Sequence, residues 1–579
     1  MKIKKISIHN FRSIKEGTFN LENFSLLIGE NNSGKSNLIS ALRTFYENDG
    51  AKYKESIDFL KFNTDDNESW IEIEYLTTDN EQSTLKEAYK SKDKILKVRR
   101  YFKATNPDIV KSNQSNIYAY VDGILSFENL FYGAQNISQA KLGKVIFIPE
   151  ISKTEDNLKL SGPSPFRDMV TFVMKKSVKN SPAYNELESA FENFNKNFKE
   201  EYSKDGFSLT ELVKDINEQI SQWEIKFGLN FNPIKPEDMI KNLLSHYFED
   251  NNLKNEQISI NLFGQGLQRH LIYTLIKLSA KYVDKKVEKK KDFSPDFTLI
   301  LFEEPEAFLH PSQQEQLNLS LKVIAQEEDQ QVICSTHSPI FVSKNIRDLL
   351  SLIRLNKVNG QTKLYLLSKN EIDSLFDENV GLFKKINEIY NDPKTNPQLK
   401  AKIKEKFINV NDDINIKLEE ESIRYFLWFD SERAALFFAK HIIICEGASE
   451  KIFLDFLVST KWNELKTRGV YLLDSLGKFN FHRYMNLFNK FGITHSLLMD
   501  SDNNKDIQDI VNDFILNNKN GFTKEVYSFP TDLEDFLGIQ KPVKCRNDRK
   551  PLNILSNFHN NKIPETKISE LKKVFEKLL

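Results

Sequence analysis

The chain has 579 residues, so its length allows about four domains of ~150 residues, or two larger ones with insertions. With 40% hydrophobic residues and a net charge of −1, it can build sizeable cores but has no overall attraction for polyanions. A nucleic-acid partner would therefore need a local basic groove or metal ions. Cys334, Cys445 and Cys545 are too scattered for a disulfide framework or a zinc site. Without a secretory signal or an apolar run near the ~18 residues of a membrane span, we expect a cytoplasmic protein with no membrane partner.

Apolar runs alternate with amphipathic helical patterns in the first part of the chain. Each run ends in a polar turn, as expected for a strand that is buried under helices on both faces. The runs cover residues 24–29, 144–150, 297–305 and 331–338. This pattern predicts an α/β fold with a parallel or mixed sheet.

The patterning changes several times along the rest of the chain. After residue 162 a charged segment has apolar residues at helical spacing, which predicts a helical insertion that we expect to mediate dimerisation. The run DKKVEKKKD at 284–292 is either a solvated loop or an edge that contacts phosphates. Turn-forming residues such as DPKTNP mark a helical linker before a second α/β unit and a tail. The expected parts are 1–162, 163–250, 251–355, 356–435, 436–545 and 546–579.

A phosphate-binding loop follows the first buried strand. Residues 29–36, GENNSGKS, fit the spacing GxxxxGKS between the strand FSLLI and an amphipathic helix. Backbone N–H groups of Asn31, Asn32, Ser33 and Gly34 would surround phosphate oxygens at the helix start. Lys35 would reach the β and γ phosphates of ATP, and Ser36 would hold Mg²⁺.

A second part of the same site is expected at the end of the strand LILFEEP. Glu303 and Glu304 would supply an acid for the Mg²⁺ shell and an acid that polarises the attacking water. The first of these is usually Asp, so the assignment of Glu303 is weaker than that of Glu304. His337 ends the next strand, VICSTH, where a role in sensing the γ phosphate competes with a purely structural role.

A glycine-rich segment at 261–279, NLFGQGLQRHLIYTLIKLS, opens an apolar helix. Gly264, Gly266, Gln268 and Arg269 lie at its start, where backbone N–H groups can meet an anion. The segment resembles a degenerate ABC signature motif. That resemblance implies a homodimer in which the signature of one subunit covers the ATP of the other. Together with NFRSIK, the P-loop, EEPE and STHSP, it resembles the SMC/RecF class of ABC ATPases over residues 1–355.

A second group of acidic residues lies in the C-terminal part. IIICEGASE reads as a buried strand that ends at Glu446; Gly447 permits a tight turn, and Ser449 is expected to cap a helix that carries Glu450 in its first turn. In HSLLMDSD, Asp500 and Asp502 are two apart, and residues i and i+2 of a strand share a face. These carboxylates would repel one another unless cations lie among them. Hard oxygen ligands suit Mg²⁺ or Mn²⁺, and two ions about 3.5–4 Å apart would serve phosphodiester cleavage.

The spacing from EGASE to LLMDSD resembles the Toprim fold, and the approach WFDSERAALFFAKHIII resembles the OLD family, in which an ABC ATPase is joined to a Toprim nuclease domain. The resemblance implies a glycine-containing turn at Gly477 and Lys478. It also implies a further acid, of which Glu534 fits better than Asp532 or Asp535. A lysine that contacts the scissile phosphate is also implied; Lys550 is the candidate and Lys544 the alternative.

The resemblance implies a nucleotide-regulated DNA endonuclease with ATP, two metal ions in the Toprim site and one with ATP. It also implies a role in bacterial anti-phage defence, with a UvrD-like helicase or a retron reverse transcriptase and its branched DNA as partner. Whether ATP activates or inhibits cleavage is open. The alternatives are an SMC/RecF-like repair ATPase without cleavage, and a topoisomerase- or primase-like Toprim enzyme. The first predicts long heptad arms or a lone head, and the second a companion domain with a nucleophilic Tyr or a zinc module.

Overall fold

A computed structural model of the chain divides it into two compact units. Unit 1 comprises 1–150, 290–306 and 311–579, and unit 2 comprises 151–289 and 307–310. Among the described helices, none is long and apolar enough to cross a bilayer. The residues that the structure describes are 1–150, 158–160, 164–178, 181–199, 201–229, 236–250, 257–279, 293–295, 297–342, 346–406, 417–418, 420–421, 424, 431–502, 506–542 and 549–579.

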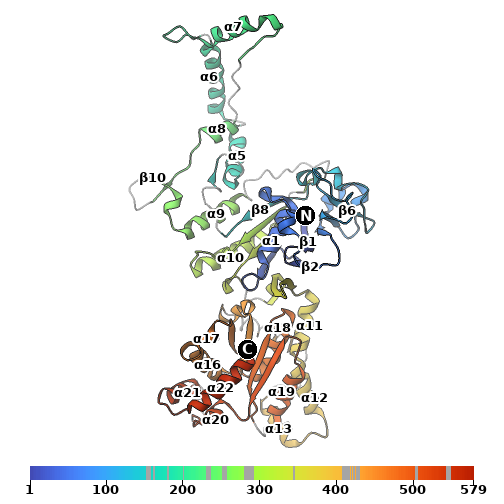
Figure 1. The fold of residues 1–579 in the computed structure, drawn as a ribbon, viewed down its shortest axis with the longest axis vertical. Coiled ribbons are helices and arrows are strands. Elements are labelled where there is room, and N and C mark those ends of the chain that lie inside the picture. The colour runs from blue at the N-terminus through green and yellow to red at the C-terminus, as the bar shows by residue number, and fades with distance from the viewer. Residues whose placement is uncertain are drawn as a thin grey trace. The chain divides into compact units, whose positions relative to one another are not determined.

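The ATPase part of unit 1 is built on a six-stranded sheet with the order β14-β13-β3-β12-β11-β8 (Figure 1). All neighbouring strands are parallel except the β13–β14 pair, which confirms the predicted α/β class. Helix α1 packs beside the sheet through Leu38, Leu42 and Phe45, which recur at helical spacing and are fully buried. The bounds are β3 (Phe24–Ile28), α1 (Lys35–Tyr46), β8 (Lys144–Ile148), β11 (Thr298–Glu303), α10 (Pro311–Ala325), β12 (Gln330–Ser335), β13 (Leu352–Val358) and β14 (Gln361–Tyr365).

A second, antiparallel sheet shares the core with the first and was not predicted. Its order is β2-β1-β4-β5-β6-β7, and its buried face packs together with α1 and the inner face of the parallel sheet. Strand β2 and the first part of β1 place buried residues between more accessible ones, because an antiparallel sheet can keep one face in water. Their bounds are β1 (Lys2–Phe11), β2 (Ile14–Asn20), β4 (Ser69–Leu76), β5 (Ile95–Lys103), β6 (Ile117–Val121) and β7 (Ile124–Leu125), with short helices α2 (Glu55–Asp58) and α3 (Asp79–Thr84) between them.

The ATPase sheet extends to Tyr365, past the expected boundary at 355. The extension is a hairpin whose turn consists of Asn359 and Gly360, both with positive φ (50° and 81°). Asn-Gly is the preferred pair for such a two-residue turn, so the sequence did carry a signal for the hairpin. The weak apolar patterning on either side of it is typical of an edge strand, and it led to the prediction of a linker.

Unit 2 is mainly helical and has only a small core. Leu158, Met169, Ile260 and Leu275 form this core, in which α5 packs against α8 and α9. Helices α6 and α7 bury no residue, and they leave apolar side chains such as Phe194 and Phe198 exposed. The charged run 284–292 lies outside the described residues. The bounds are α5 (Pro165–Val178), α6 (Pro182–Phe198), α7 (Leu209–Ile220), α8 (Pro236–Asn242), β9 (Phe248–Glu249), β10 (Gln257–Ile258) and α9 (Gln265–Ser279).

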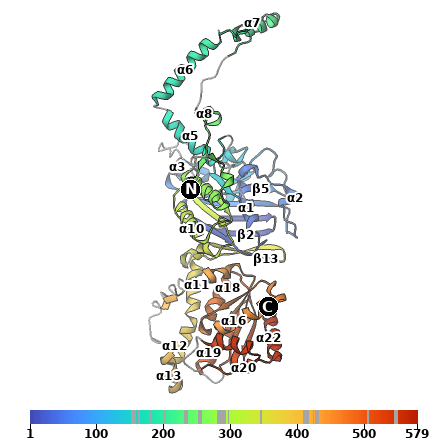
Figure 2. The ribbon, with the colours of Figure 1, turned by 90° about the vertical axis from the view of Figure 1, so that its left-hand side faces the viewer.

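The C-terminal part of unit 1 has a four-stranded parallel sheet with the order β16-β15-β17-β18. Helices α16, α18, α19 and α20 of this part are labelled in Figure 2. Parallel pairing places the carboxyl ends of all four strands at one edge. Ile443 and Leu498 are fully buried, as expected for strands that are covered on both faces. The bounds are β15 (His441–Cys445), α16 (Ala448–Thr460), α17 (Asn463–Lys466), β16 (Val470–Asp474), α18 (Phe481–Lys490), β17 (His495–Asp500), α19 (Asp506–Asn517), β18 (Thr523–Phe529) and α20 (Leu533–Leu537).

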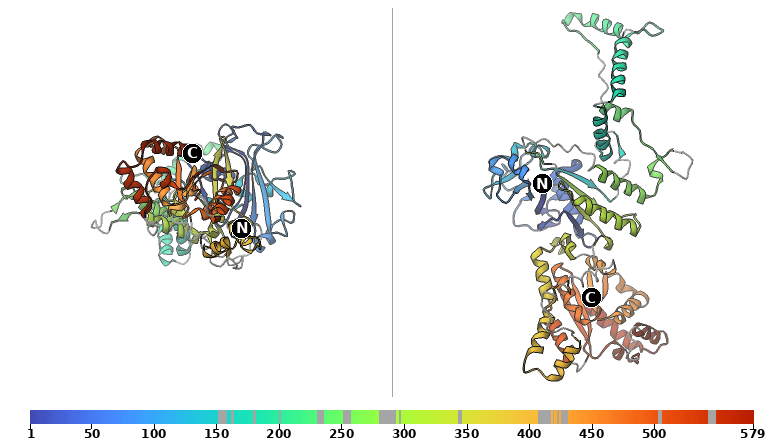
Figure 3. Two further views of the ribbon diagram at one scale, coloured as in Figure 1. Left: turned by 90° about the horizontal axis from the view of Figure 1, so that it is seen from below. Right: turned by 180° about the vertical axis from the view of Figure 1, so that it is seen from behind.

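The expected tail and linker both belong to the core around this sheet. Ile554, Ile568 and Phe575 of helices α21 (Lys550–His559) and α22 (Glu565–Leu578) are buried with Ile443 and Phe453. The C-terminus lies among the helices of this domain (Figure 3). On the other side α11 packs against α18 and α13 against α19. The linker helices are α11 (Lys369–Asn379), α12 (Gly381–Asn391), α13 (Pro397–Lys406) and α15 (Ser431–Ala434).

Candidate nucleotide and carboxylate sites

The P-loop and the acidic strand end enclose one cavity of about 380 Å³. Asn31, Asn32, Gly34, Lys35 and Ser36 line it on one side. From the predicted set, Glu303, Glu304 and His337 line it on the other side. Glu150 also lines the cavity; sequence reasoning missed it, although it is the last residue of the predicted run 144–150.

The P-loop backbone is shaped by glycines that a side chain could not replace. Gly29 has φ 137°, and a Cβ there would lie 2.2 Å from the Leu355 carbonyl oxygen. Gly34 has φ 109° at the start of α1, and a Cβ there would meet Thr362 Oγ1 at 2.2 Å. Because both neighbours belong to the β13–β14 hairpin, that hairpin supports the loop from outside the motif. Ser33 points inward, since its side chain is buried in the structure.

Lys35 folds back over its own loop. Its ammonium donates to the carbonyl oxygens of Gly29 at 2.9 Å and Glu30 at 2.8 Å. Burial lowers its pKa to about 8, while Glu304 and Glu306 oppose this shift. A buried ammonium held by neutral carbonyls is a natural position for an incoming phosphate anion.

The acidic strand end supplies three carboxylates to this region. Burial raises the pKa of Glu303, and a hydrogen bond with Ser36 opposes the rise, so the two predicted Mg²⁺ ligands contact each other. Glu304 has a positive φ of 44°, and its Oε1 lies 3.5 Å from His337 Nε2. Glu306, which sequence reasoning missed, accepts a hydrogen bond of 2.6 Å from the His337 backbone N–H. Its position in the quoted EEPE motif was the available signal.

The signature segment lies in unit 2. Gly264 immediately precedes α9, and its carbonyl oxygen accepts from the N–H groups of Leu267 and Gln268. The Gln268 side chain is buried and donates to the Phe263 carbonyl oxygen at 2.8 Å. Gly266 lies in the first turn of the helix, and the Arg269 side chain lies outside the described residues. The structure thus gives the segment the predicted loop-to-helix form, whereas the contact with a partner's ATP stays a prediction.

Glu446 and Glu450 lie at the carboxyl end of β15, as the sequence indicates. Glu446 follows the strand and its Oε2 accepts from the Asp500 N–H at 3.1 Å. Glu450 is buried in the first turn of α16, where its Oε2 accepts from the Gly447 N–H at 3.0 Å. Burial raises the pKa of Glu450 to about 7, and the charge of Glu446 adds to the shift. The prediction that Ser449 caps this helix is wrong, because the helix begins one residue earlier, at Ala448, and Ser449 lies within it.

Asp500 and Asp502 approach the same group, but not for the predicted reason. Strand β17 ends at Asp500, and Asp502 lies beyond it with φ 55°, so the alternation of strand faces does not apply. Asp500 Oδ1 is buried and has no hydrogen-bond partner. Burial raises the pKa of Asp500 to about 9, with further contributions from Glu450 and Glu446.

Of the three acids after β18, only Glu534 is buried toward the carboxylate group. It is 2% exposed, its Oε1 has no hydrogen-bond partner, and its charge helps to raise the pKa of Glu450. Asp532 instead caps α20 by accepting from the Asp535 N–H at 3.0 Å. Both aspartates also form ion pairs with Lys541, at 2.5 and 2.8 Å. Lys541 can neutralise only one of the two carboxylates, and the charge of Asp532 still adds to the rise in the pKa of Asp500.

Lys478 is the cation of this group, whereas its sequence context predicts only a position in a turn. It is 1% exposed, and its Nζ lies 2.8 Å from Asp502 Oδ2 and 3.9 Å from Glu446 Oε2. It also donates to the Asp500 carbonyl oxygen at 2.7 Å. The predicted Lys550 begins α21, and its charge, after that of Lys478, opposes the burial that raises the pKa of Glu446. Lys544 lies outside the described residues.

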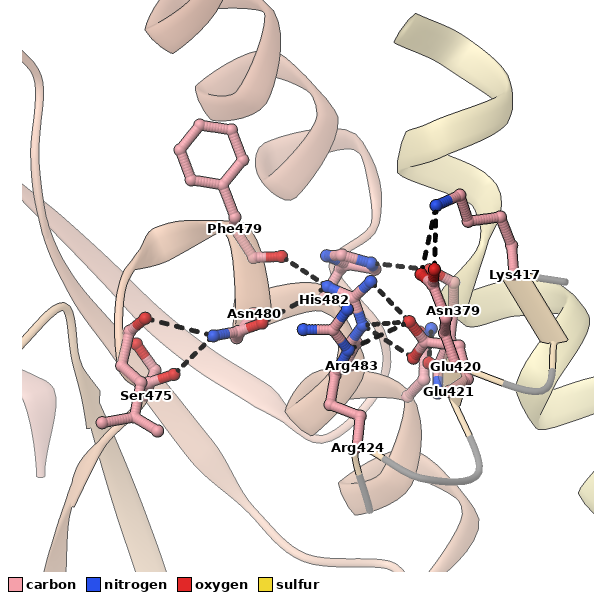
Figure 4. Close-up of polar contacts among 12 residues, drawn as sticks. Asn379, Lys417, Glu420, Glu421, Arg424, Ser475, Phe479, Asn480, His482 and Arg483 are labelled. Carbon is pink, nitrogen blue, oxygen red and sulfur yellow. Dashed lines mark hydrogen bonds and ion pairs between the residues drawn. The ribbon is translucent and has the colours of Figure 1, made fainter. Parts of the chain in front are cut away.

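The turn that carries Lys478 is braced by polar contacts (Figure 4). Asn480 Nδ2 donates to the carbonyl oxygens of Ser475 and Leu476, at 2.9 and 3.2 Å. Arg483 Nη1 donates to the Phe479 carbonyl oxygen, and its Nε and Nη2 donate to the buried Glu421 at 2.6–2.9 Å. Because Lys478 is held from both sides, its ammonium has a fixed position at the carboxylates.

The carboxylate group fits a divalent cation by its chemistry. Glu446 and Asp502 lie near the Lys478 ammonium, and Glu450 and Glu446 help to raise the pKa of Asp500. Asp500 Oδ1 and Glu534 Oε1 are buried with no hydrogen-bond partner among the described residues. Buried charges of this kind are normally paired or coordinate a metal. Among the described residues, however, no three acidic, His or Cys side chains stand close enough to form a ready metal cage. Mutual repulsion and the Lys478 ammonium between Glu446 and Asp502 account for that spacing.

Arg354 joins the ATPase sheet to the Toprim part within unit 1. It is 1% exposed and donates four hydrogen bonds to backbone carbonyls: Phe437 at 3.1 Å, Ala439 at 3.2 Å, Phe491 at 3.0 Å and Gly492 at 3.1 Å. Burial lowers its pKa to about 10, so it stays charged at neutral pH. Phe437 and Ala439 precede β15, and Glu446 follows that strand. Phe491 and Gly492 follow α18, and Lys478 precedes that helix.

The remaining predictions concern the cysteines. Cys334 and Cys445 are free thiols, fully buried in β12 and β15, as expected for small core residues. Cys545 lies outside the described residues.

Known families match the two parts of the chain that carry these sites. Residues 1–342, more than half of the chain, match the AAA ATPase domain family, and residues 437–502 match the family described as "Overcoming lysogenization defect protein-like, TOPRIM domain". Fold and sites thus define a P-loop ATPase of the AAA ATPase domain family that also carries a Toprim domain. With these two domains in this order, the chain belongs to the OLD family.

Two relatives are similar to this chain at low identity. Old nuclease of Escherichia phage P2 is 27% identical over 369 residues, which is 59% of this chain and 57% of that protein. Endonuclease GajA of Bacillus cereus (strain VD045) is 23% identical over 509 residues, 87% of this chain and 75% of that protein. The chain thus spans little more than half of the phage relative.

A solved SMC head bound to the C-terminal winged-helix domain of ScpA covers 65% of this chain and 100% of its own, with 15% identity. Its TM-score of 0.37 is too low to support the fold, which rests on strand order and the family matches.

Proposed function

We propose that this protein is an ATP-binding, metal-dependent endonuclease that cuts DNA in its Toprim domain. The observation that carries the proposal is the buried carboxylate group around Lys478, with unpaired oxygens on Asp500 and Glu534. The two relatives whose names include nuclease activity support the same reaction class. An SMC/RecF-like ATPase without cleavage would leave this clustering of buried carboxyl groups unexplained.

Glu446, Glu450, Asp500, Asp502 and Glu534 are the residues that would hold Mg²⁺ or Mn²⁺. Such ions supply an activated water and neutralise charge at the leaving oxygen of a phosphodiester. Lys478 fixes Asp502 and the Asp500 backbone in place, and its ammonium adds positive charge beside the position of the scissile phosphate. Lys550, half-buried at the start of α21, is the proposed contact to a DNA phosphate.

The nucleotide part of the proposal rests on the P-loop cavity. Lys35 would exchange its two carbonyl contacts for the phosphates of ATP, while Ser36 and Glu303 would share the Mg²⁺ ion. Glu304 and His337 lie in contact distance at the opposite wall, where a water attacking the γ phosphate would be oriented. We further propose that the exposed apolar faces of α6 and α7 pair between two copies of the chain.

Supercoiled plasmid tests the proposal directly. Purified protein is incubated with plasmid in Mg²⁺ or Mn²⁺, with and without ATP, and wild type is compared with Asp500→Ala. Nicking that disappears in the variant supports the nuclease, and the ATP lanes give the sign of regulation. If neither metal gives cleavage that depends on Asp500, the chain is a binding ATPase and the nuclease proposal is wrong.

A role in anti-phage defence is part of the same proposal, with a helicase or a retron element as possible partner. It is supported by membership of the OLD family. Cells that express the chain together with its chromosomal neighbours should form fewer phage plaques than cells that carry Asp500→Ala. Equal plaque numbers would argue against a defence role.

A further inference from the structure

A groove of about 910 Å³ lies in unit 1 between the P-loop and the starting edge of the Toprim sheet. We infer that this groove binds the phosphodiester backbone of DNA, as an anchoring site separate from the carboxylate group. The inference deepens the proposed function, because it takes DNA as the substrate. Residues 30–33 of the P-loop form one wall, and residues at the starts of β15, β16, β17 and β18 form another.

The charge of the groove is the first argument. Lys357, Lys440, Arg468 and Lys524 line it, all four are exposed, and none forms an ion pair with a carboxylate of the described residues. Glu30 is the single acidic side chain among the described residues that line it, and Leu579, which carries the terminal carboxylate of the given chain, lines it too. Since the whole chain has a net charge of −1, four unpaired cations in one groove form a local basic surface.

The other lining residues indicate which polyanion fits. Asn31, Asn32, Thr467 and Thr494 offer amides and hydroxyls, which commonly contact phosphate and sugar oxygens. No described lining residue is Phe, Tyr or Trp, so the groove has no platform on which a base or a free nucleotide would stack. The groove therefore fits a nucleic-acid backbone, which it would bind without reading sequence.

The position of the groove is the third argument. It lies at the starting edge of the Toprim strands, whereas Glu446 and Asp500 lie at their carboxyl ends. Five-residue strands span about 16 Å, a distance that about five base pairs of DNA cover. Asn31 and Asn32 line both this groove and the nucleotide cavity. DNA in the groove would thus touch the loop that binds ATP, and by linkage each ligand would alter the affinity for the other.

Binding of a fluorescein-labelled 30-base-pair duplex to the full chain tests the inference. Fluorescence anisotropy is recorded over a range of KCl concentrations in the Asp500→Ala background, which prevents cleavage. Lys440→Gln, Arg468→Gln and Lys524→Gln are compared singly and together. Each should weaken binding several-fold and lower the slope of log K against log[KCl] by about 0.9. Lys92→Gln, which removes an exposed and unpaired lysine from the turn before β5, is the matched control.

The inference is wrong if the triple variant binds DNA with the affinity and salt slope of Lys92→Gln. It is also wrong if the triple variant keeps DNA binding but loses the thermal stabilisation that tripolyphosphate gives the parent protein, because the groove would then take a small polyphosphate. Plasmid nicking by the wild-type chain separates this test from the proposed function. Groove-dependent binding without any nicking would overturn the nuclease and leave the anchoring site standing.

Discussion

The nucleotide cavity and the carboxylate group both lie at the carboxyl ends of parallel strands, yet they are prepared for ligands of opposite charge. In the first, Lys35 is surrounded by carbonyl oxygens and has its pKa lowered to about 8. In the second, Lys478 is outnumbered by carboxylates, and the pKa of Asp500 is raised to about 9. The first site is therefore suited to an anion, and the second to a cation.

The comparison shows that topology fixes the place of a site and the residues after each strand fix its ligand. After β3, glycines and backbone N–H groups create a positive loop; after β15 and β17, acidic side chains create a negative one. The predictions below test whether the two sites are as separate as this contrast implies.

The largest effect is expected from Asp500→Asn, which keeps the shape of the side chain but removes a proposed metal ligand. Cleavage of plasmid should fall by about 1000-fold or more, because metal neutralisation of the leaving oxygen contributes several kcal/mol. Binding of ATP should not change. The control is Asp513→Asn, which alters an exposed carboxylate on α19. Equal loss in both variants would show that the effect is not specific to the metal site.

Lys478→Met should lower the free energy of unfolding by about 3–5 kcal/mol, because it removes the buried partner of Asp502. Added Mg²⁺ should restore part of this stability in the variant, since the ion would replace the missing positive charge. Urea unfolding with EDTA or with Mg²⁺ measures both effects. Lys490→Met, which breaks a more exposed ion pair with Glu378, should cost no more than about 1 kcal/mol. If both variants lose the same stability, Lys478 is not the central cation.

Lys35→Ala should weaken binding of a fluorescent ATP analogue by about 10- to 100-fold, because each charged hydrogen bond to phosphate contributes about 1.5–3 kcal/mol. Lys478→Met should bind the analogue as wild type does. If Lys478→Met lost nucleotide affinity as Lys35→Ala does, that result would contradict the separation of the two sites.

The smallest effect concerns acid sensitivity. Burial lowers the pKa of His482 to about 3, so this histidine is neutral in the folded chain and takes up a proton on unfolding below about pH 6.5. The folded state is therefore destabilised as pH falls from about 6.5 toward 3, by up to about 1.4 kcal/mol per pH unit. Thermal unfolding at pH 7.5 and 5.0 should show a weaker pH dependence for His482→Gln. His559→Gln, at an exposed histidine on α21, should keep the wild-type dependence.

Much of the ATPase part was predictable because its signals are local. The P-loop, the pair Glu303–Glu304 and the strand that precedes His337 each need only a few consecutive residues, and the structure gathers them in one cavity. Glu446, Glu450 and Asp500 were found for the same reason. The antiparallel sheet was missed because its pairing joins distant segments such as β1 and β4, and no short motif marks such pairing.

The role of Lys478 illustrates what sequence alone does not reveal. Nothing in DSLGKFN indicates that this lysine is buried, since lysines are usually exposed. Its position follows from the turn at Gly477 and from the contacts of Asn480 and Arg483. Likewise, Asp502 reaches the site by a left-handed residue past the strand and not by strand alternation.

The β13–β14 hairpin has a practical consequence for anyone who wishes to exchange the two catalytic parts between proteins. One face of it meets Gly29 and Gly34 of the P-loop, and Arg354 and Tyr365 meet the Toprim part, where a Cβ on Gly492 would lie 2.4 Å from the Tyr365 ring. A chimera joined at residue 355 would divide this hairpin and leave both partners with a damaged surface. Junctions placed after Tyr365 would keep the P-loop support intact but would still need Arg354 to find four matching carbonyls. We therefore expect the two parts to co-evolve, so that a substitution on one contacting surface requires a compensating change on the other.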